Sequence, residues 1–212
     1  NGGLQWSTIL RLPEFQNEFG MGWNGDHTEL ENGSWGPRFD GSMQLWGNKY
    51  ENSQKLKPYS PIKNNIKDFF DAGFRYNNSV SFNGATDKSE YYVSFSQISD
   101  DGMVPTDADS YDKYTFSARG SHKVKALTFS SSLNYSYQKN KFATTGQGLT
   151  MLNSLYQTPR DVSIISLQDQ NDIFNSPGYF YTPYGVMNPY YILENYLNEY
   201  DAERFYGKFQ VD

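Results

Sequence analysis

The sequence predicts an all-β, antiparallel protein, and three observations carry that prediction. Several segments alternate apolar and polar residues with period two, most clearly 125–138. Aromatic residues make up 17% of the chain, which favours strands over helices. Short polar turns and very long connections alternate between these segments. Because successive strand side chains point to opposite faces, each alternating segment has one apolar face and one polar face.

We expect three strands in the first part of the chain, at 12–23, 67–83 and 89–99. A turn at 84–88 joins the last two, and its Gly and Asp suit hairpin geometry. Residues 24–66 carry many Gly and Pro residues and no periodicity, which predicts a long loop. The apolar residues that share a face are, strand by strand, Phe15, Phe19, Met21 and Trp23; Phe74, Tyr76, Val80 and Phe82; and Tyr91, Val93 and Phe95.

The second part predicts three more strands, at 111–121, 125–138 and 202–211, with a tight turn at 121–123. Residues 139–199 form a second long irregular stretch, in which 148–156 has the leucine spacing of a short helix. Four prolines later in that stretch argue against long regular elements. The apolar faces of the three strands carry Tyr114, Phe116 and Ala118; Leu127, Phe129, Leu133, Tyr135 and Tyr137; and Phe205, Phe209 and Val211.

The connections are asymmetric. Those after even-numbered strands are short, at 84–88 and 121–123, and those after odd-numbered strands are long, at 24–66, 100–110 and 139–199. Outer-membrane barrels have short periplasmic turns and long extracellular loops, and they turn an apolar face to lipid and a polar face to a wet lumen. We therefore expect a segment of an antiparallel transmembrane β-barrel with long extracellular loops. The alternative is a soluble β-domain whose loop lengths differ by chance.

Composition excludes several other classes. A mean hydropathy of -0.76 excludes a helical membrane protein, a test that barrels escape because only alternate residues face lipid. The net charge of -6 argues against nucleic acid as a partner. The absence of Cys excludes disulfides and thiolate metal sites. The chain begins without Met and stops inside an alternating strand, so we interpret it as an internal piece of a larger protein.

Six strings lie along the chain in a fixed order: ENGSWGPRFDG at 31–41, NIKDFFDAG at 65–73, SVSFNGATDKSEYYV at 79–93, DGMVP at 101–105, NPYYILEN at 188–195 and RFYG at 204–207. In this order and spacing the chain resembles the SusC/RagA family of TonB-dependent outer-membrane transporters. The resemblance runs from about residue 12 to the end. Each string alone is weak, whereas six in register are specific.

The resemblance implies a plugged barrel of 22 strands, of which 1–212 holds about six as part of one TonB-dependent receptor β-barrel domain. The family's plug domain and remaining strands have no counterpart here. It further implies a place in the outer membrane of a Gram-negative cell and import of an oligosaccharide, glycan or peptide. The implied partners are a SusD-like surface lipoprotein, membrane lipid, and the TonB complex through the missing N-terminal part.

No catalytic set is apparent, and we expect neither enzymatic activity nor a cofactor. His27 lies in a long loop and His122 in the expected turn, and neither is flanked by nucleophile or orienting motifs. Asp107 and Asp109 are weak Ca²⁺ candidates in an acidic loop whose spacing does not match an EF-hand. A solvated acidic loop is the simpler interpretation, and we expect no metal site.

Loop aromatics are the better binding candidates, because a flat ring can stack on a sugar or pack against a partner. The alternative is that they pack the long loops onto one another. Trp23, Tyr111 and Tyr137 at strand ends fit an interfacial girdle instead. The candidates for substrate or partner contact are Trp35, Trp46, Tyr179, Tyr181, Tyr184, Tyr190 and Tyr191.

Basic residues on the polar strand faces would line the lumen or contact a plug if the barrel prediction holds. These are Arg75, Lys113, Arg119, Arg204 and Lys208. The sequence thus predicts a segment of a nutrient importer. The alternative is a soluble, aromatic-rich β-domain that binds carbohydrate at its loops.

Overall fold

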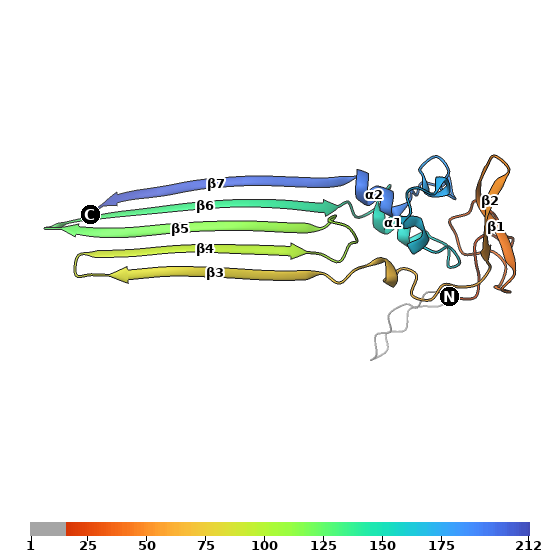
Figure 1. Cartoon of the computed structure of the whole chain (residues 1–212), viewed down its shortest axis with the longest axis horizontal. Helices are drawn as coiled ribbons and strands as arrows, with labels where there is room; N and C mark the ends of the chain where they lie inside the picture. Colours follow the sequence, from red (N-terminus) through yellow and green to blue (C-terminus); the bar gives the residue numbers. More distant parts are fainter. Residues whose placement is uncertain (1–15) are drawn as a thin grey trace, which may run out of the picture.

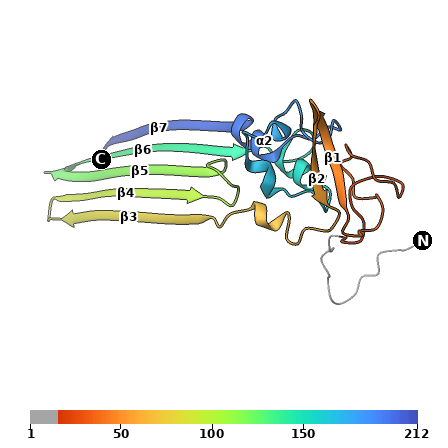
Figure 2. The ribbon, with the colours of Figure 1, turned by 45° about the vertical axis from the view of Figure 1, so that its right-hand side comes forward.

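The computed structural model describes residues 16–212. The chain divides into a long sheet and a loop body, defined here as residues 16–73, 102–109 and 144–196. The loop body lies beyond one end of the sheet, as both views show (Figures 1 and 2). Residues 12–15 of the first expected strand lie outside the described residues.

Five consecutive strands form the sheet in the order β3-β4-β5-β6-β7. Every neighbouring pair is antiparallel, so the sheet is a meander whose edges are β3 and β7 (Figure 1). The five strands expected from residue 67 onward are therefore present, with shifted ends. They run Phe74–Ala85 (β3), Ser89–Asp101 (β4), Ser110–Val124 (β5), Leu127–Ala143 (β6) and Leu197–Val211 (β7).

The expected contrast in connection lengths is confirmed for this sheet. Residues 86–88 and 125–126 close the hairpins at one end, while 102–109 and 144–196 connect strands at the end nearer the loop body. The turn expected at 121–123 was placed wrongly: β5 continues to Val124, and the chain reverses at Lys125, with a φ of 57°. No Gly or Pro marks that reversal, so its position was not readable. His122 is accordingly a strand residue.

The loop body contains elements that the sequence did not predict. The first is a hairpin of Met43–Tyr50 (β1) and Ser53–Pro58 (β2), so the expectation of no element in 24–66 was wrong. Its register shifts between Trp46 and Lys49, where Gly47 adopts a φ of 75°. The shift leaves two residues of β1, Gly47 and Asn48, without partners in β2, so the ladder is interrupted there.

The expected strand at 12–23 does not form over its described residues. Residues 16–23 make three isolated bridges, Phe19 with Arg38, Gly22 with Ser34 and Trp23 with Asp26. Consecutive bridges go to different partners, so no ladder builds up. This alternating segment is therefore an irregular part of the loop body. Among the described residues, the sheet holds five strands rather than the six expected.

Two short helices lie between β6 and β7. Met151–Tyr156 (α1) confirms the helix expected within 148–156, and Thr150 caps it by accepting a hydrogen bond from the Asn153 backbone N–H. Pro189–Asn195 (α2) was not expected, because its proline was interpreted as a breaker. Proline at the first helical position instead suits a helix start, and Asn188 caps it. Within residues 16–212, no helix is long and apolar enough to span a bilayer.

The buried apolar residues all belong to the loop body, and none of the buried core residues of 16–212 lies in β3–β7. Residues from both halves of the chain meet there, among them Met21, Trp46, Phe69, Leu155 and Ile192. Three short 3-10 helices lie in the loop body: Lys67–Phe69 (η1), Ile165–Gln168 (η2) and Ile173–Asn175 (η3). The first two add Phe69 and Leu167 to this core, and the third buries the polar Asn175. The protein therefore has a core beside its sheet rather than against it.

Candidate functional site

The sheet has one apolar face, and the strand register aligns its side chains across all five strands. Residues directly opposite one another share a face. One row across the sheet is Val80, Phe95, Phe116, Tyr135 and Phe205. No other part of the described chain covers this face, and Phe205 is 70% exposed. The register therefore confirms the prediction of which side chains of these five strands share the apolar face.

This apolar face continues for several rows toward the hairpin turns. Tyr135 lies eight residues beyond Leu127 in β6, so the rows between them cover about 27 Å along the strand. Toward the loop body, the rings of Tyr114 and Tyr137 are stacked with centroids 6.4 Å apart. The further side chains of this apolar band are Phe82, Tyr91, Val93, Ala118, Val124, Phe129, Leu133, Phe209 and Val211.

The three strand-end aromatics considered for a girdle do not lie together. Tyr137 borders the apolar band. Tyr111 pairs with Asp100 and Asn140 on the opposite face, and Trp23 lies in the loop body. The register, which the sequence alone does not supply, separates Tyr111 from Tyr137.

The opposite face of the sheet is polar and carries all five basic residues expected there. Small side chains fill its middle, where the Ser117 hydroxyl donates to Asn134 Oδ1 at 2.8 Å. Arg75 forms an ion pair with Asp100 at 3.5 Å, and the Arg119 guanidinium lies 4.8 Å from the Tyr92 ring centroid. The five are Arg75, Lys113, Arg119, Arg204 and Lys208. Their contact with a lumen or a plug stays a prediction.

A hollow of about 700 Å³ opens on this polar face near the hairpin turns. Its main row runs across the sheet through Asn83, Tyr92, Arg119, Ser132 and Lys208. That volume lies within the range of small-molecule sites.

The loop aromatics divide by burial. Trp46, Tyr181 and Tyr190 are buried, so for these three the packing interpretation holds and surface contact with a ligand does not. The rings of Trp46 and Tyr181 lie 5.6 Å apart within the core. Burial raises the pKa of the Tyr190 phenol to about 12, and the nearby Asp71 adds to the shift.

Four of the expected aromatics remain accessible. Trp35 and Tyr184 are exposed, and Tyr179 and Tyr191 are partly buried. Trp35 is 58% exposed and lines a recess of about 360 Å³ with Trp23, Asn24 and Gly25. Backbone hydrogen bonds from Gly25 N–H to Trp35 C=O and from Trp35 N–H to Gly22 C=O hold this segment together.

A buried ion pair, which the sequence did not reveal, joins the two halves of the loop body. Lys57 Nζ lies 2.5 Å from Asp161 Oδ2, and Asp161 Oδ1 accepts from the Met21 backbone N–H at 2.9 Å. Lys57 Nζ also lies 4.9 Å from the Trp46 ring centroid. Burial lowers the pKa of Lys57, and the negative charge and hydrogen bond of Asp161 partly offset that decrease. The partners are 104 residues apart, so no local pattern could have paired them.

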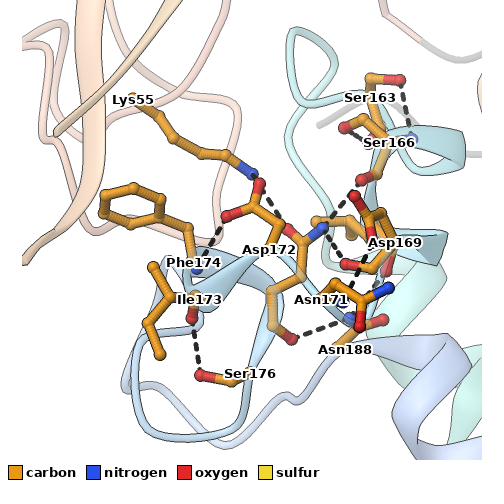
Figure 3. Close-up of polar contacts among 12 residues, drawn as sticks. Lys55, Ser163, Ser166, Asp169, Asn171, Asp172, Ile173, Phe174, Ser176 and Asn188 are labelled. Atoms are coloured by element: carbon orange, nitrogen blue, oxygen red, sulfur yellow. Dashed lines mark hydrogen bonds and ion pairs between the residues drawn. The ribbon is translucent and has the colours of Figure 1, made fainter.

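A second polar network supports the loop segment 163–188 (Figure 3). Lys55 Nζ contacts Asp172 at 2.8 Å and donates to Asn175 Oδ1 at 3.0 Å. Asn188 donates to the backbone oxygens of Leu167 and Asn175. Burial raises the pKa of Asp172, but hydrogen bonds from Lys55 and Phe174 outweigh it and hold this pKa below its ordinary value. In this segment, side chains provide the hydrogen-bond partners that backbone groups would find within a helix or sheet.

The acidic loop uses Asp109 structurally. Its carboxylate accepts from the Val104 backbone N–H at 3.2 Å, and burial raises its pKa. Asp107 lies in the same loop, and its backbone oxygen accepts from the Ser110 hydroxyl. Residues 16–212 contain no group of three or more His, Cys, Asp or Glu side chains placed to hold a metal ion.

The two histidines lie far from each other. His27 has its ring nitrogens 3.2 Å from the Met21 backbone oxygen and 3.1 Å from that of Leu45. His122 lies on the sheet, 2.7 Å from the Ser89 hydroxyl. Within the described residues, neither histidine ring has a hydrogen bond to a carboxylate that would orient it. These contacts therefore resemble structural hydrogen bonds.

Comparison with protein-family models finds no match to this chain, and comparison with curated proteins finds none either. Membership of the SusC/RagA family therefore stays a prediction from its six strings. The geometry on its own establishes a β-rich protein with a two-faced sheet and a separately packed loop body.

Proposed function

We propose that this chain is part of the barrel of a SusC-like, TonB-dependent transporter in a Gram-negative outer membrane. In this proposal the transporter imports a glycan or peptide together with a SusD-like surface lipoprotein. The observation that carries the proposal is the two-faced sheet, with apolar side chains aligned across five strands on one face and polar, basic side chains on the other.

The apolar face supports a lipid contact. Soluble monomers rarely expose contiguous apolar patches larger than a few hundred Å². Outer-membrane barrels carry an apolar band about 25 Å tall on strands tilted by about 35–45°, so the rows from Tyr135 to Leu127 would cover about 20 Å of that height. Lipid would satisfy Phe205 and Phe209, which are 70% and 71% exposed.

The sheet edges support a larger barrel. β3 and β7 each pair with a single neighbour among the described strands. An unpaired edge cannot stay in hydrocarbon, because every backbone polar group there needs a hydrogen-bond partner. In the proposal, further strands of the same barrel pair with β3 and β7 and close it.

The loop body supports an extracellular role. It joins the sheet at the end with the long connections, which in outer-membrane barrels is the extracellular end. Its own hydrophobic core gives those loops a fixed shape. Such a body could cover the barrel mouth and present a stable surface to substrate and to a lipoprotein partner.

Neighbouring residues of β7 allow a direct test of the two faces. Phe205 lies on the apolar face and Tyr206 on the polar face. Because the sequence contains no Cys, Phe205→Cys and Tyr206→Cys can each carry a single spin label. In the protein reconstituted in lipid bilayers, we expect the label at 205 to be accessible to oxygen and the label at 206 to a water-soluble nickel complex. Equal accessibility of both labels to the nickel complex contradicts the membrane proposal.

Import is tested separately, in cells. Uptake of labelled oligosaccharides and peptides is compared between cells with and without the coding gene, before and after the proton gradient is dissipated. The proposal expects uptake that requires both the gene and the gradient. Uptake unaffected by loss of the gene contradicts the import role, even if the labels report lipid contact.

A second candidate is a soluble carbohydrate-binding β-domain. The recess between Trp23 and Trp35 favours it, because exposed indole rings can stack on sugar rings. This candidate expects a monomer without detergent, with sugar binding that Trp35→Ala abolishes. Detergent dependence decides against it.

A further inference from the structure

The hollow on the polar face is formed by differences in side-chain length. Ser132 lies between Arg119 and Lys208 in the strand register, so a short side chain separates two long ones. The next row toward the turns places Ser121 opposite Ser130. The floor of the hollow therefore consists of small hydroxyl side chains, while Arg119 and Lys208 stand at its sides.

The polar face is basic in a chain that is acidic. Its carboxylates within β3–β7 are Glu90 and Asp100, and Asp100 already pairs with Arg75. The chain as a whole has a net charge of -6. Charge is thus separated, with basic groups concentrated on this face. They are Arg75, Lys113, Arg119, Lys123, Arg204 and Lys208.

The two cations of the hollow form no ion pair with any residue of 16–212. The Arg119 guanidinium lies over the Tyr92 ring, 4.8 Å from its centroid, and a guanidinium that contacts a ring can still donate N–H groups at its edge. Glu90 lines the hollow without forming an ion pair with either cation. Two neighbouring cations with short hydroxyls between them match an anion that also accepts hydrogen bonds from hydroxyls.

We propose that this hollow binds a carboxylate-bearing ligand held between Arg119 and Lys208. Arg119 supplies paired N–H donors that suit the planar carboxylate, and Lys208 supplies a point charge. Ser121, Ser130 and Ser132 donate to or accept from the rest of the ligand. The carboxylate can come from an acidic sugar or from Asp and Glu side chains of a polypeptide segment. This inference stands whether or not the apolar face meets lipid.

Binding is measured on the full chain in detergent micelles, with fluorescent oligogalacturonate and fluorescent oligo-aspartate as probes. Neutral oligogalactose and oligo-asparagine serve as matched probes without the carboxylates. We expect at least one acidic probe to bind and its neutral counterpart not to bind. Arg119→Gln and Lys208→Gln should each weaken that binding roughly tenfold, the effect of losing one charge-assisted hydrogen bond.

The control variant is Arg204→Gln, which removes the same charge from the same face outside the hollow. Its binding should stay within about twofold of the parent at physiological salt, because screening limits charges beyond about 8 Å. Near-ultraviolet circular dichroism of the loop body confirms folding of every variant.

The two probes distinguish the sources of the carboxylate. Binding of oligogalacturonate alone assigns the hollow to acidic sugars, binding of oligo-aspartate alone assigns it to a polypeptide, and binding of both leaves the carboxylate as the recognised group. Failure of both acidic probes overturns the inference. An equal loss in Arg119→Gln and Arg204→Gln also overturns it, because that result means attraction to the whole face. Spin-label accessibility at 205 and 206 is independent of all these outcomes.

Discussion

The sheet and the loop body differ in how they place their apolar side chains: the loop body buries them, and the sheet leaves them exposed. The loop body buries Phe69, Leu155 and Ile192 to 1% exposure or less, whereas the sheet leaves Phe82, Phe205 and Phe209 at 65% or more. The loop body therefore holds its shape through its own core. No other segment of residues 16–212 covers the apolar face of the sheet. Within the described chain, burial of apolar side chains is therefore confined to one region.

The largest expected effect tests whether the loop body depends on its buried ion pair. Asp161→Leu leaves Lys57 charged and unpaired in the core and frees the Met21 N–H. We expect a loss of about 3–5 kcal/mol in the free energy of unfolding, measured by denaturant titration of loop-body tryptophan fluorescence. The double variant Lys57→Met/Asp161→Leu should recover most of that loss. No recovery would mean that packing around Asp161, rather than its charge, stabilises this region.

A charge in the apolar band tests the opposite region. Leu133 lies in the middle of the band and Asn134 follows it on the polar face. Leu133→Arg should reduce insertion into lipid vesicles by about 2–4 kcal/mol, while Asn134→Arg should insert almost normally. The measurement is the fraction of protein that becomes protected from protease after refolding with vesicles. Equal damage from both changes would falsify the assignment of the faces.

A smaller effect is expected at the β5–β6 turn, which is remote from the loop body. Lys125 adopts a φ of 57°, a region that costs a side chain roughly 1–2 kcal/mol. Lys125→Asn should raise the free energy of unfolding by about 0.5–1 kcal/mol, since Asn tolerates this conformation better. Lys123→Asn, in the strand, serves as the control. A gain from Lys123→Asn as large as that from Lys125→Asn contradicts the backbone explanation.

A pH dependence is expected in the loop body. Burial and the Asp161 carboxylate raise the pKa of Tyr59 to about 12 from its model-peptide value of 10.0. A raised pKa means that the folded state favours the neutral phenol. The stability from Tyr59 is therefore complete below pH 10 and is lost as the pH rises through about 12.

The measurement is phenolate absorbance against pH, together with unfolding at each pH. Tyr59→Phe should remove one late-ionising group and flatten the alkaline loss of stability. Its hydroxyl donates to the Pro37 backbone oxygen at 2.8 Å, so a uniform loss at lower pH is expected as well. An unchanged alkaline limb would show that another group controls it.

Prediction from sequence succeeded best in the sheet and least in the loop body. Alternation placed Phe129 and Leu133 on one face and Asn134 on the other, and the register bears that out. The β1–β2 hairpin was missed because its buried face carries Lys57 while Leu45 and Leu56 are exposed, so side-chain polarity does not mark its faces. α2 was missed because Pro189 was interpreted as a breaker, although Asn188 followed by Pro189 is itself a helix-start signal.

The residues of the candidate site also divide into those that the sequence could predict and those that it could not. The basic residues of the polar face could be assigned from alternation, because each side chain's face depends on its own strand. Burial of Trp46, Tyr181 and Tyr190 could not, because it depends on chain segments more than a hundred residues apart. The hollow was also unreadable, since it requires Arg119, Ser132 and Lys208 from three different strands to lie in one row.

The sequence by itself determined the strands within 74–99, 111–138 and 202–211, the facing of their side chains and the asymmetry of their connections. The tertiary structure alone decided which aromatics are buried, how Lys57 finds Asp161 and where the polar face is hollowed. The physical reason is the separation along the sequence of the residues that interact. A strand's two faces follow from the local geometry of successive residues, whereas a core, a buried ion pair and a cross-strand row exist only when distant segments meet.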